Sequence, residues 1–195
     1  MTRRARAVVT RALLAAFILA SSWPAGADPS IPPTLQAAIL AKMLAYDRAL
    51  KTRVGPSVDI GVVFKESDKA SSEAAVGLAA AFEAMAGHPV QGLPLRTSRH
   101  AYKDQEHLSE WMKAAGVDVV CVVTGLVKER DAIRAASVEA KAITVGADRA
   151  QVEGGLAVAV VLHGTTPRIL VNIASAQAVG MNLDPKLLQL SDVIR

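Results

Sequence analysis

The sequence predicts a single three-layer α/β domain in which a mixed, mostly parallel sheet is flanked by helices. Strand-like and helix-like segments alternate over the first two thirds, and an antiparallel hairpin with closing helices follows. Apolar residues make up 51% of the 195 positions, enough for one ordinary core. Because no repeat or linker divides the chain, residues 28–195 are expected to form one domain.

Residues 1–27 have the organisation of a secretory signal peptide. A basic start, Met1–Arg11, precedes the apolar run Ala12–Ala20, and the small residues Ala25-Gly26-Ala27 form a cleavage site. We expect cleavage before Asp28, export to the periplasm and no remaining anchor, because a membrane-spanning helix needs about 20 apolar residues. The alternative interpretation of this run is a transmembrane anchor.

The charge of the chain argues against a nucleic-acid partner. The formal net charge is +4, with 22 basic and 18 acidic residues. The leader holds four of the basic residues and no acidic one, so residues 28–195 carry 18 of each sign. Without a basic excess, the exported chain lacks the electrostatic attraction that nucleic-acid binding requires.

The first predicted elements are a helix, a strand and a longer helix. Apolar residues recur at three- and four-residue steps from Pro33 to about Leu50, which indicates one face of a helix. Those residues are Leu35, Ile39, Met43, Tyr46 and Leu50. The β-branched content of Val58–Phe64 predicts a strand. Ser67 or Asp68 can then cap a helix that stops at Gly87, two residues before a proline.

The alternation continues with two further helices and three strands. Val90–Leu95 is a weaker strand prediction, and Asp104 is expected to cap a helix that Gly116 ends. Three more elements follow in order: a central strand that is almost continuously apolar, a helix and a short strand. They are predicted over Val117–Val123, about Val127–Ala140 and Ala142–Val145.

The last third departs from this pattern. Leu156–Leu162 and Arg168–Ile173 are separated by too few residues for a crossover helix, so they should pair as an antiparallel hairpin. A helix over Ser175–Val179 is broken by Gly180. Asp184-Pro185 starts a closing helix, whose buried stripe is expected to be Leu187, Leu190 and Ile194.

Composition and spacing identify no catalytic, cofactor-binding or metal-binding residues. None of the four histidines has a second histidine two to four positions away or a cysteine or carboxylate cluster beside it, so surface or turn positions are expected. They are His88, His100, His107 and His163. The alternating charges of Lys128–Asp131 are typical of a solvated face. No dinucleotide-binding, Walker or hydrolase motif is present, so neither enzymatic activity nor a cofactor is expected.

Two positions have a second interpretation. Thr124-Gly125 follows the central strand, where a doubly wound sheet places a ligand, although such a pair is more often a plain turn. Cys121 lies within the central apolar run, so we expect a buried, inert thiol rather than a reactive one. As the only cysteine, it excludes an internal disulfide.

A distinct order of residues marks the segment Ala142–Ile194. A strand ends in Thr-Val-Gly, a Gly-Gly turn leads into the hairpin, the second hairpin strand ends in asparagine, and paired leucines lie in the closing helix. The positions that carry this order are Gly146, Gly154, Gly155, Asn172, Ala176, Gly180, Leu187 and Leu188. The order resembles the YfiR/HmsC-like family of periplasmic proteins. Each position also has a structural explanation, because glycine permits positive φ, asparagine caps helices and leucine packs.

The resemblance implies a non-enzymatic regulator. Well-known members of that family dimerise in the periplasm and repress a membrane-bound diguanylate cyclase by binding its periplasmic sensor region, which lowers cyclic-di-GMP signalling. The chain departs from the family in lacking the tryptophan-proline pair that many relatives have after the first helix, and Tyr46-Asp47 stand there. It also lacks the cysteines of the redox-responsive members.

Two functions from different classes follow. The first is a periplasmic regulator, expected to be a homodimer, that binds the periplasmic region of an inner-membrane cyclase or sensor kinase. The second is a small solute-binding component of a transport system, although a binder that closes on its ligand normally has two lobes. An exported enzyme is a third, weaker hypothesis.

Overall fold

The computed structural model describes residues 31–194 of the chain. The expected signal peptide, residues 1–27, and its cleavage site therefore lie outside the described residues. Within this range, every helix is too short or too polar to cross a membrane.

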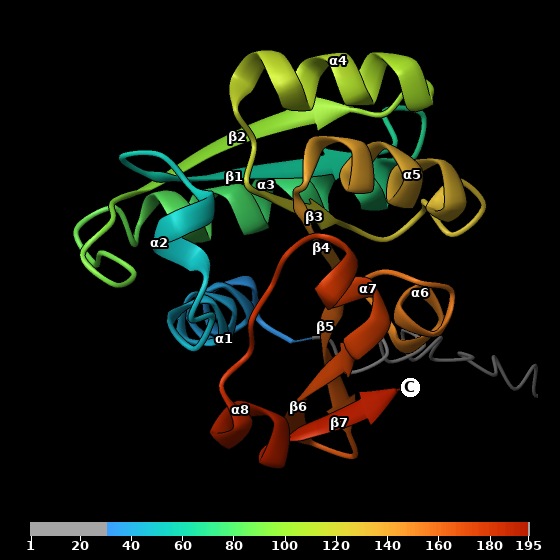
Figure 1. Cartoon of the computed structure of the whole chain (residues 1–195). Coiled ribbons are helices and arrows are strands. Elements are labelled where there is room, and N and C mark those ends of the chain that lie inside the picture. Colours follow the sequence, from blue (N-terminus) through green and yellow to red (C-terminus); the bar gives the residue numbers. More distant parts are fainter. Residues whose placement is uncertain (1–30, 195) are drawn as a thin grey trace, which may run out of the picture.

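A seven-stranded sheet forms the centre of the fold (Figure 1), with the order β2-β1-β3-β4-β5-β6-β7. Neighbouring strands from β2 to β5 are parallel, β5 and β6 are antiparallel, and β6 and β7 are parallel. The prediction of a mixed, mostly parallel sheet is thus confirmed. The strands are β1 (Val58–Phe64), β2 (Leu95–Ala101), β3 (Val119–Val122), β4 (Ile143–Gly146), β5 (Val158–His163), β6 (Thr166–Asn172) and β7 (Ser191–Ile194).

Helices cover both faces of this sheet, as the three-layer prediction requires. The side chains of α1 and α3 share one core cluster, whereas those of α4 and α5 pack in a second cluster on the other face, where α6 also lies. The helices are α1 (Pro33–Ala45), α2 (Leu50–Arg53), α3 (Lys69–Glu83), α4 (Gln105–Ala115), α5 (Arg130–Ala140), α6 (Arg149–Glu153), α7 (Ile173–Ala178) and α8 (Pro185–Gln189).

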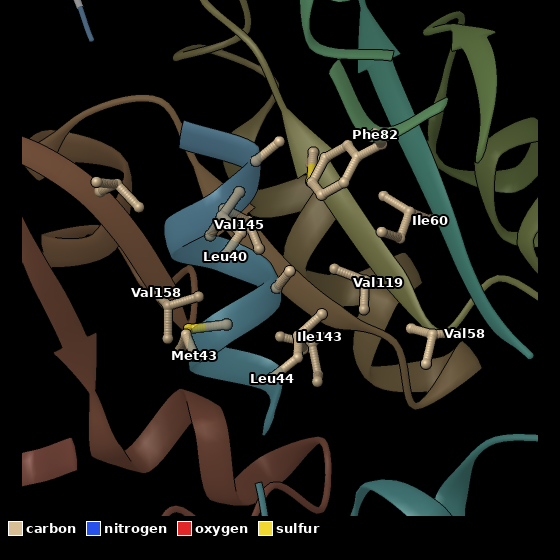
Figure 2. Packing of buried hydrophobic residues seen from close by; sticks show 14 of the residues in the cluster. Leu40, Met43, Leu44, Val58, Ile60, Phe82, Val119, Ile143, Val145 and Val158 are labelled. Atoms are coloured by element: carbon tan, nitrogen blue, oxygen red, sulfur yellow. The ribbon is translucent and has the colours of Figure 1, made fainter. Parts of the chain in front are cut away.

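The larger core cluster lies between α1, α3 and the sheet. Figure 2 shows Leu40, Met43 and Leu44 of α1 pointing toward the strands. All three are at most 2% exposed. They face β-branched residues of β1, β3, β4 and β5, together with Phe82 of α3 (Figure 2). Because β3 and β4 are buried along their whole length, the interior strands are apolar on both faces.

Several predicted helix boundaries are confirmed. Asp68 caps α3 by accepting a hydrogen bond from the Ser71 amide, and Asp104 caps α4 in the same way. Gly116 ends α4 in the left-handed conformation at φ 62°. These signals are local, so they can be recognised in the sequence without knowledge of the fold.

The continuous first helix that the periodicity predicts is wrong. The chain leaves α1 after Ala45 and re-enters helix at α2. Asp47 lies in the break with no exposed surface, and its carboxylate accepts hydrogen bonds from the amides of Ala49 and Asn182. Leu35, placed on the buried stripe, is 42% exposed.

The strand predicted over Val90–Leu95 is also misplaced. Val90 and Leu93 form only an isolated bridge, and β2 begins at Leu95 and continues through polar residues to Ala101. The reason is that β2 is an edge strand, which in the described part of the chain pairs with β1 alone. Most of its side chains are at least partly exposed, so β2 carries no apolar signal.

The closing helix is shorter than predicted. Helix α8 ends at Gln189, and Ser191–Ile194 form β7 beside β6. Leu190, placed on the buried stripe, is 67% exposed. The hairpin of β5 and β6 is confirmed, with a tight turn at Gly164-Thr165, whereas the short helix α6 was not predicted.

Candidate functional site

The candidate site is a cleft at the carboxyl ends of β3, β4 and β5, which we call the strand-end cleft. Its volume is about 600 Å³. The start of α1 and the middle of α3 form its other walls. The lining residues are Ile31, Pro33, Gln36, Ala74, Leu78, Cys121–Thr124, Val145–Arg149 and Val160–Leu162. A cleft at this end of the strands is where doubly wound sheets usually bind ligands.

The walls of the strand-end cleft are mostly apolar, with a few polar groups. Asp148 caps α6 through Oδ1, which accepts a hydrogen bond from the Gln151 amide. Arg149, half-exposed, lies 3.5 Å from a carboxylate oxygen of Glu153 and 3.7 Å from one of Asp192. The cleft therefore offers apolar surface together with one anion and one cation, a combination suited to reversible binding.

The turn at Thr124-Gly125 has a clear structural role. Thr124 lines the strand-end cleft, and its carbonyl accepts a 2.6 Å hydrogen bond from the Ser71 hydroxyl. Gly125 has φ 92°, and a Cβ there would lie 2.8 Å from a carboxylate oxygen of Asp68. The start of α3 thus holds the turn against the end of β3. A plain turn was the favoured interpretation, and ligand binding here stays the untested alternative.

Cys121 is buried, as predicted. It is 1% exposed, and burial raises the pKa of its thiol to about 12. The thiol therefore stays protonated at neutral pH and is a poor nucleophile. No histidine is among the residues that line the strand-end cleft.

Most residues of the family order lie next to α6 and α7, Leu187 and Leu188 lie on α8, and only Gly146 of the set lines the strand-end cleft. Asn172 caps α7 by accepting a hydrogen bond from the Ser175 amide, and its side-chain amide donates to the Val152 carbonyl of α6. Ala176 is buried, and Gly180 follows α7 at φ 80°. Leu187 is buried and Leu188 partly buried, both in the larger core cluster.

Two arginines of α5 lie against the Gly-Gly turn between α6 and β5. A Cβ on Gly154 would collide with the guanidinium of Arg130. A Cβ on Gly155, whose φ is 106°, would lie 2.8 Å from Cδ of Arg134. Side chains of α5 therefore crowd both glycines, and Gly155 also needs the backbone freedom of glycine.

The structure places His88 and His163 on the surface, as expected, but brings His100 and His107 together. His100 Nε2 and His107 Nδ1 are 3.1 Å apart. The predicted cap at Asp104 correctly placed His107 in the first turn of α4. The sequence predicted this strand over Val90–Leu95, so His100 was not expected to lie on it. Because β2 instead ends at Ala101, His100 lies beside the first turn of α4.

Residues 33–192 match a family model described as DUF4154, YfiR/HmsC-like. The curated proteins contain no match.

Three solved structures share the fold at low sequence identity. The ABC domain from Streptococcus pneumonia in complex with L-Trp has a TM-score of 0.59 and 16% identity, with 84% of this chain and 60% of that chain covered. A conserved domain protein from Vibrio cholerae O1 biovar El Tor has a TM-score of 0.60 and 13% identity, with 84% of this chain and 60% of that chain covered. The ligand-free, open structure of a substrate binding protein with adhesive properties from Clostridium difficile has a TM-score of 0.52 and 16% identity. It covers 79% of this chain and 59% of that chain. The chain thus spans about 60% of the length of the first two.

Proposed function

Because the chain belongs to the YfiR/HmsC-like family, we propose that it is a non-catalytic regulator that works in the periplasm. In this proposal it binds the periplasmic sensor region of an inner-membrane signalling protein, such as a diguanylate cyclase or a sensor kinase. The family match over residues 33–192 is the observation that carries the proposal. The secretory pattern of residues 1–27 supports the compartment.

The edge of the sheet at β7 supports self-association in this proposal. Among residues 31–194, strand β7 pairs with β6 alone, so within this range its other side presents unpaired backbone groups. Leu190 and Val193 beside this edge are 67% and 37% exposed. A homodimer that joins two β7 edges would cover both side chains, and we include this dimer in the proposal.

The regulatory role is tested in a strain that lacks the protein. We expect cyclic-di-GMP to rise in that strain, and an inner-membrane cyclase to be recovered with the tagged protein from cross-linked periplasm. Unchanged cyclic-di-GMP, together with recovery of no membrane protein, would contradict the proposal.

The dimer is tested separately by light scattering. Leu190→Asp should produce a monomer, because a charge would enter the joined edge. Val76→Asp is the matched control, since Val76 is 51% exposed on α3, away from β7. A wild-type monomer would refute the dimer and leave the receptor proposal standing.

The second candidate function is that of a small solute-binding component of a transport system. The strand-end cleft, with its apolar walls and about 600 Å³ of volume, favours it. Ala74 lines this cleft, so the larger side chain of Ala74→Phe should abolish saturable binding of a small molecule, measured by equilibrium dialysis. Ala114→Phe, on the exposed face of α4, is the matched control and should leave this binding unchanged. If dialysis against periplasmic extract finds no bound molecule, this function is excluded.

A further inference from the structure

The two histidines that the fold brings together are positioned by separate rigid elements. His100 lies on β2, in register with Val63 of β1, one residue before the strand ends. His107 lies in the first turn of α4, and its backbone amide donates a 2.8 Å hydrogen bond to the capping carboxylate of Asp104. The strand and the capped helix therefore fix both imidazole rings before any ligand arrives.

A tryptophan supports the first ring. Trp111 stacks on His100, with ring centroids 4.3 Å apart and 12° between the planes. On the sheet, Trp111 lies over Gly61, where a Cβ would collide with the indole. Glycine at this position therefore lets the indole lie flat on β1, and the indole restricts the rotation of His100.

The nitrogens that face each other have the spacing of adjacent metal ligands. Two nitrogens bound to one ion at about 2.1 Å lie roughly 3.0–3.4 Å apart in octahedral or tetrahedral geometry. The observed separation of His100 Nε2 and His107 Nδ1 is 3.1 Å. The separation therefore matches that of two nitrogens that share one ion.

We propose that His100 and His107 form a binding site for a divalent transition-metal ion of the copper, nickel or zinc type, which imidazole ligands suit. Over residues 31–194 no group of three or more histidine, cysteine or carboxylate side chains is placed to hold an ion. The site therefore supplies two protein ligands and leaves the remaining positions to water. Such an open site binds an ion reversibly, unlike a closed structural zinc site.

Lys103 opposes the ion. When Nδ1 of His107 binds a metal, the ring proton must sit on Nε2, which lies 3.5 Å from Nζ of Lys103. Two donors then face each other, and the ammonium also repels the ion. Lys103 therefore weakens the site without forming part of it.

The test uses the purified exported protein after treatment with a chelator. Trp111 is the only tryptophan in residues 28–195, so its fluorescence reports on this site. We expect added Cu²⁺ to quench Trp111 with saturation at one equivalent, and Zn²⁺ to compete. Absence of saturable quenching would overturn the proposal.

Variants separate the site from adventitious binding. His100→Ala and His107→Gln should each weaken binding by roughly tenfold or more, because one imidazole remains. The double variant His88→Ala, His163→Ala is the matched control and should bind as the wild type does, since both side chains are exposed elsewhere. An equal loss of Cu²⁺ affinity in the control variant would overturn the assignment of the site to His100 and His107.

Lys103→Ala gives a readout that unfolding cannot imitate. Removing the ammonium should tighten Cu²⁺ binding several-fold, whereas general damage to the fold would weaken it. Unchanged or weaker binding in a Lys103→Ala variant with native circular dichroism would contradict the assigned geometry.

Discussion

Asp47 shows how much of this fold depends on a single carboxylate. It is fully buried, and Oδ2 accepts a 2.9 Å hydrogen bond from the Arg53 guanidinium. Oδ1 accepts from two backbone amides, Ala49 and Asn182. Asp47 thus connects the end of α1 to a segment 135 positions later. Nothing in the sequence distinguishes this aspartate from the exposed ones.

The loss of this carboxylate should be costly. We expect Asp47→Ala to lower the free energy of unfolding by about 3–5 kcal/mol, because the guanidinium of Arg53 would stay partly buried without its partner. Urea unfolding followed by circular dichroism measures the change.

Arg48→Ala is the matched control for Asp47→Ala. The ion pair that Arg48 forms with Asp184 has a 56% exposed arginine, so its loss should cost at most about 1 kcal/mol. Equal effects of the two substitutions would show that the buried network contributes no more than a surface pair.

His100 should make stability depend on pH. Its pKa is lowered from 6.5 to about 4 in the folded protein, first by burial and then by His107 and Lys103. Between these values the unfolded chain binds a proton that the folded chain does not, so stability falls as the pH drops through that window. Urea midpoints between pH 7 and 4.5, measured with chelator, should fall more for wild type than for His100→Gln. Parallel curves would contradict the lowered pKa.

At the scale of elements, the buried strands could be predicted from the sequence better than the exposed ones. The interior strands and the β5–β6 hairpin could be predicted because both faces of an interior strand select apolar, β-branched residues. The two edge strands, β2 and β7, could not, because they pair on one side and carry polar residues. Helix caps were found where a carboxylate binds an amide three residues later, as Asp68 and Asp104 do. The break after α1 was missed because a partner far along the chain stabilises it.

The Gly-Gly turn allows a paired test within one element. Gly155→Ala should lower stability by about 1–3 kcal/mol, because φ is 106° and the side chain of Arg134 is close. Gly154→Ala should cost less, since φ is −81° and the end of the Arg130 side chain can swing away. Thermal unfolding of both variants measures the difference. Similar melting temperatures would mean that backbone conformation at this turn contributes little.

At the scale of the whole molecule, the layered fold could be predicted and the strand-end cleft could not. Alternation of strand and helix is visible along the sequence, and it fixes parallel pairing and helix layers. The cleft collects residues from α1, α3 and three strands, from Ile31 to Leu162, and most of these are the same apolar types that fill the core. Only the three-dimensional arrangement separates a cleft wall from a core residue.

Cys121 provides a probe of the molecule as a whole. It lies on β3 in the middle of the sheet, 1% exposed, with its pKa raised to about 12 by burial. A thiol reagent at pH 8 should therefore react only through unfolding, and its rate should rise with urea in step with the loss of circular dichroism. Rapid labelling of the native protein would show that this part of the sheet opens locally.

The contact between the end of α1 and residues 182–184 has a consequence for biogenesis. Arg48 N donates to the carbonyl of Asn182, and Asp184 N donates to the carbonyl of Tyr46. Helix α1 can therefore dock fully only after residues 182–184 have been made. During that delay the nascent polypeptide stays incompletely folded, which is the state that the proposed export through a secretion channel would require.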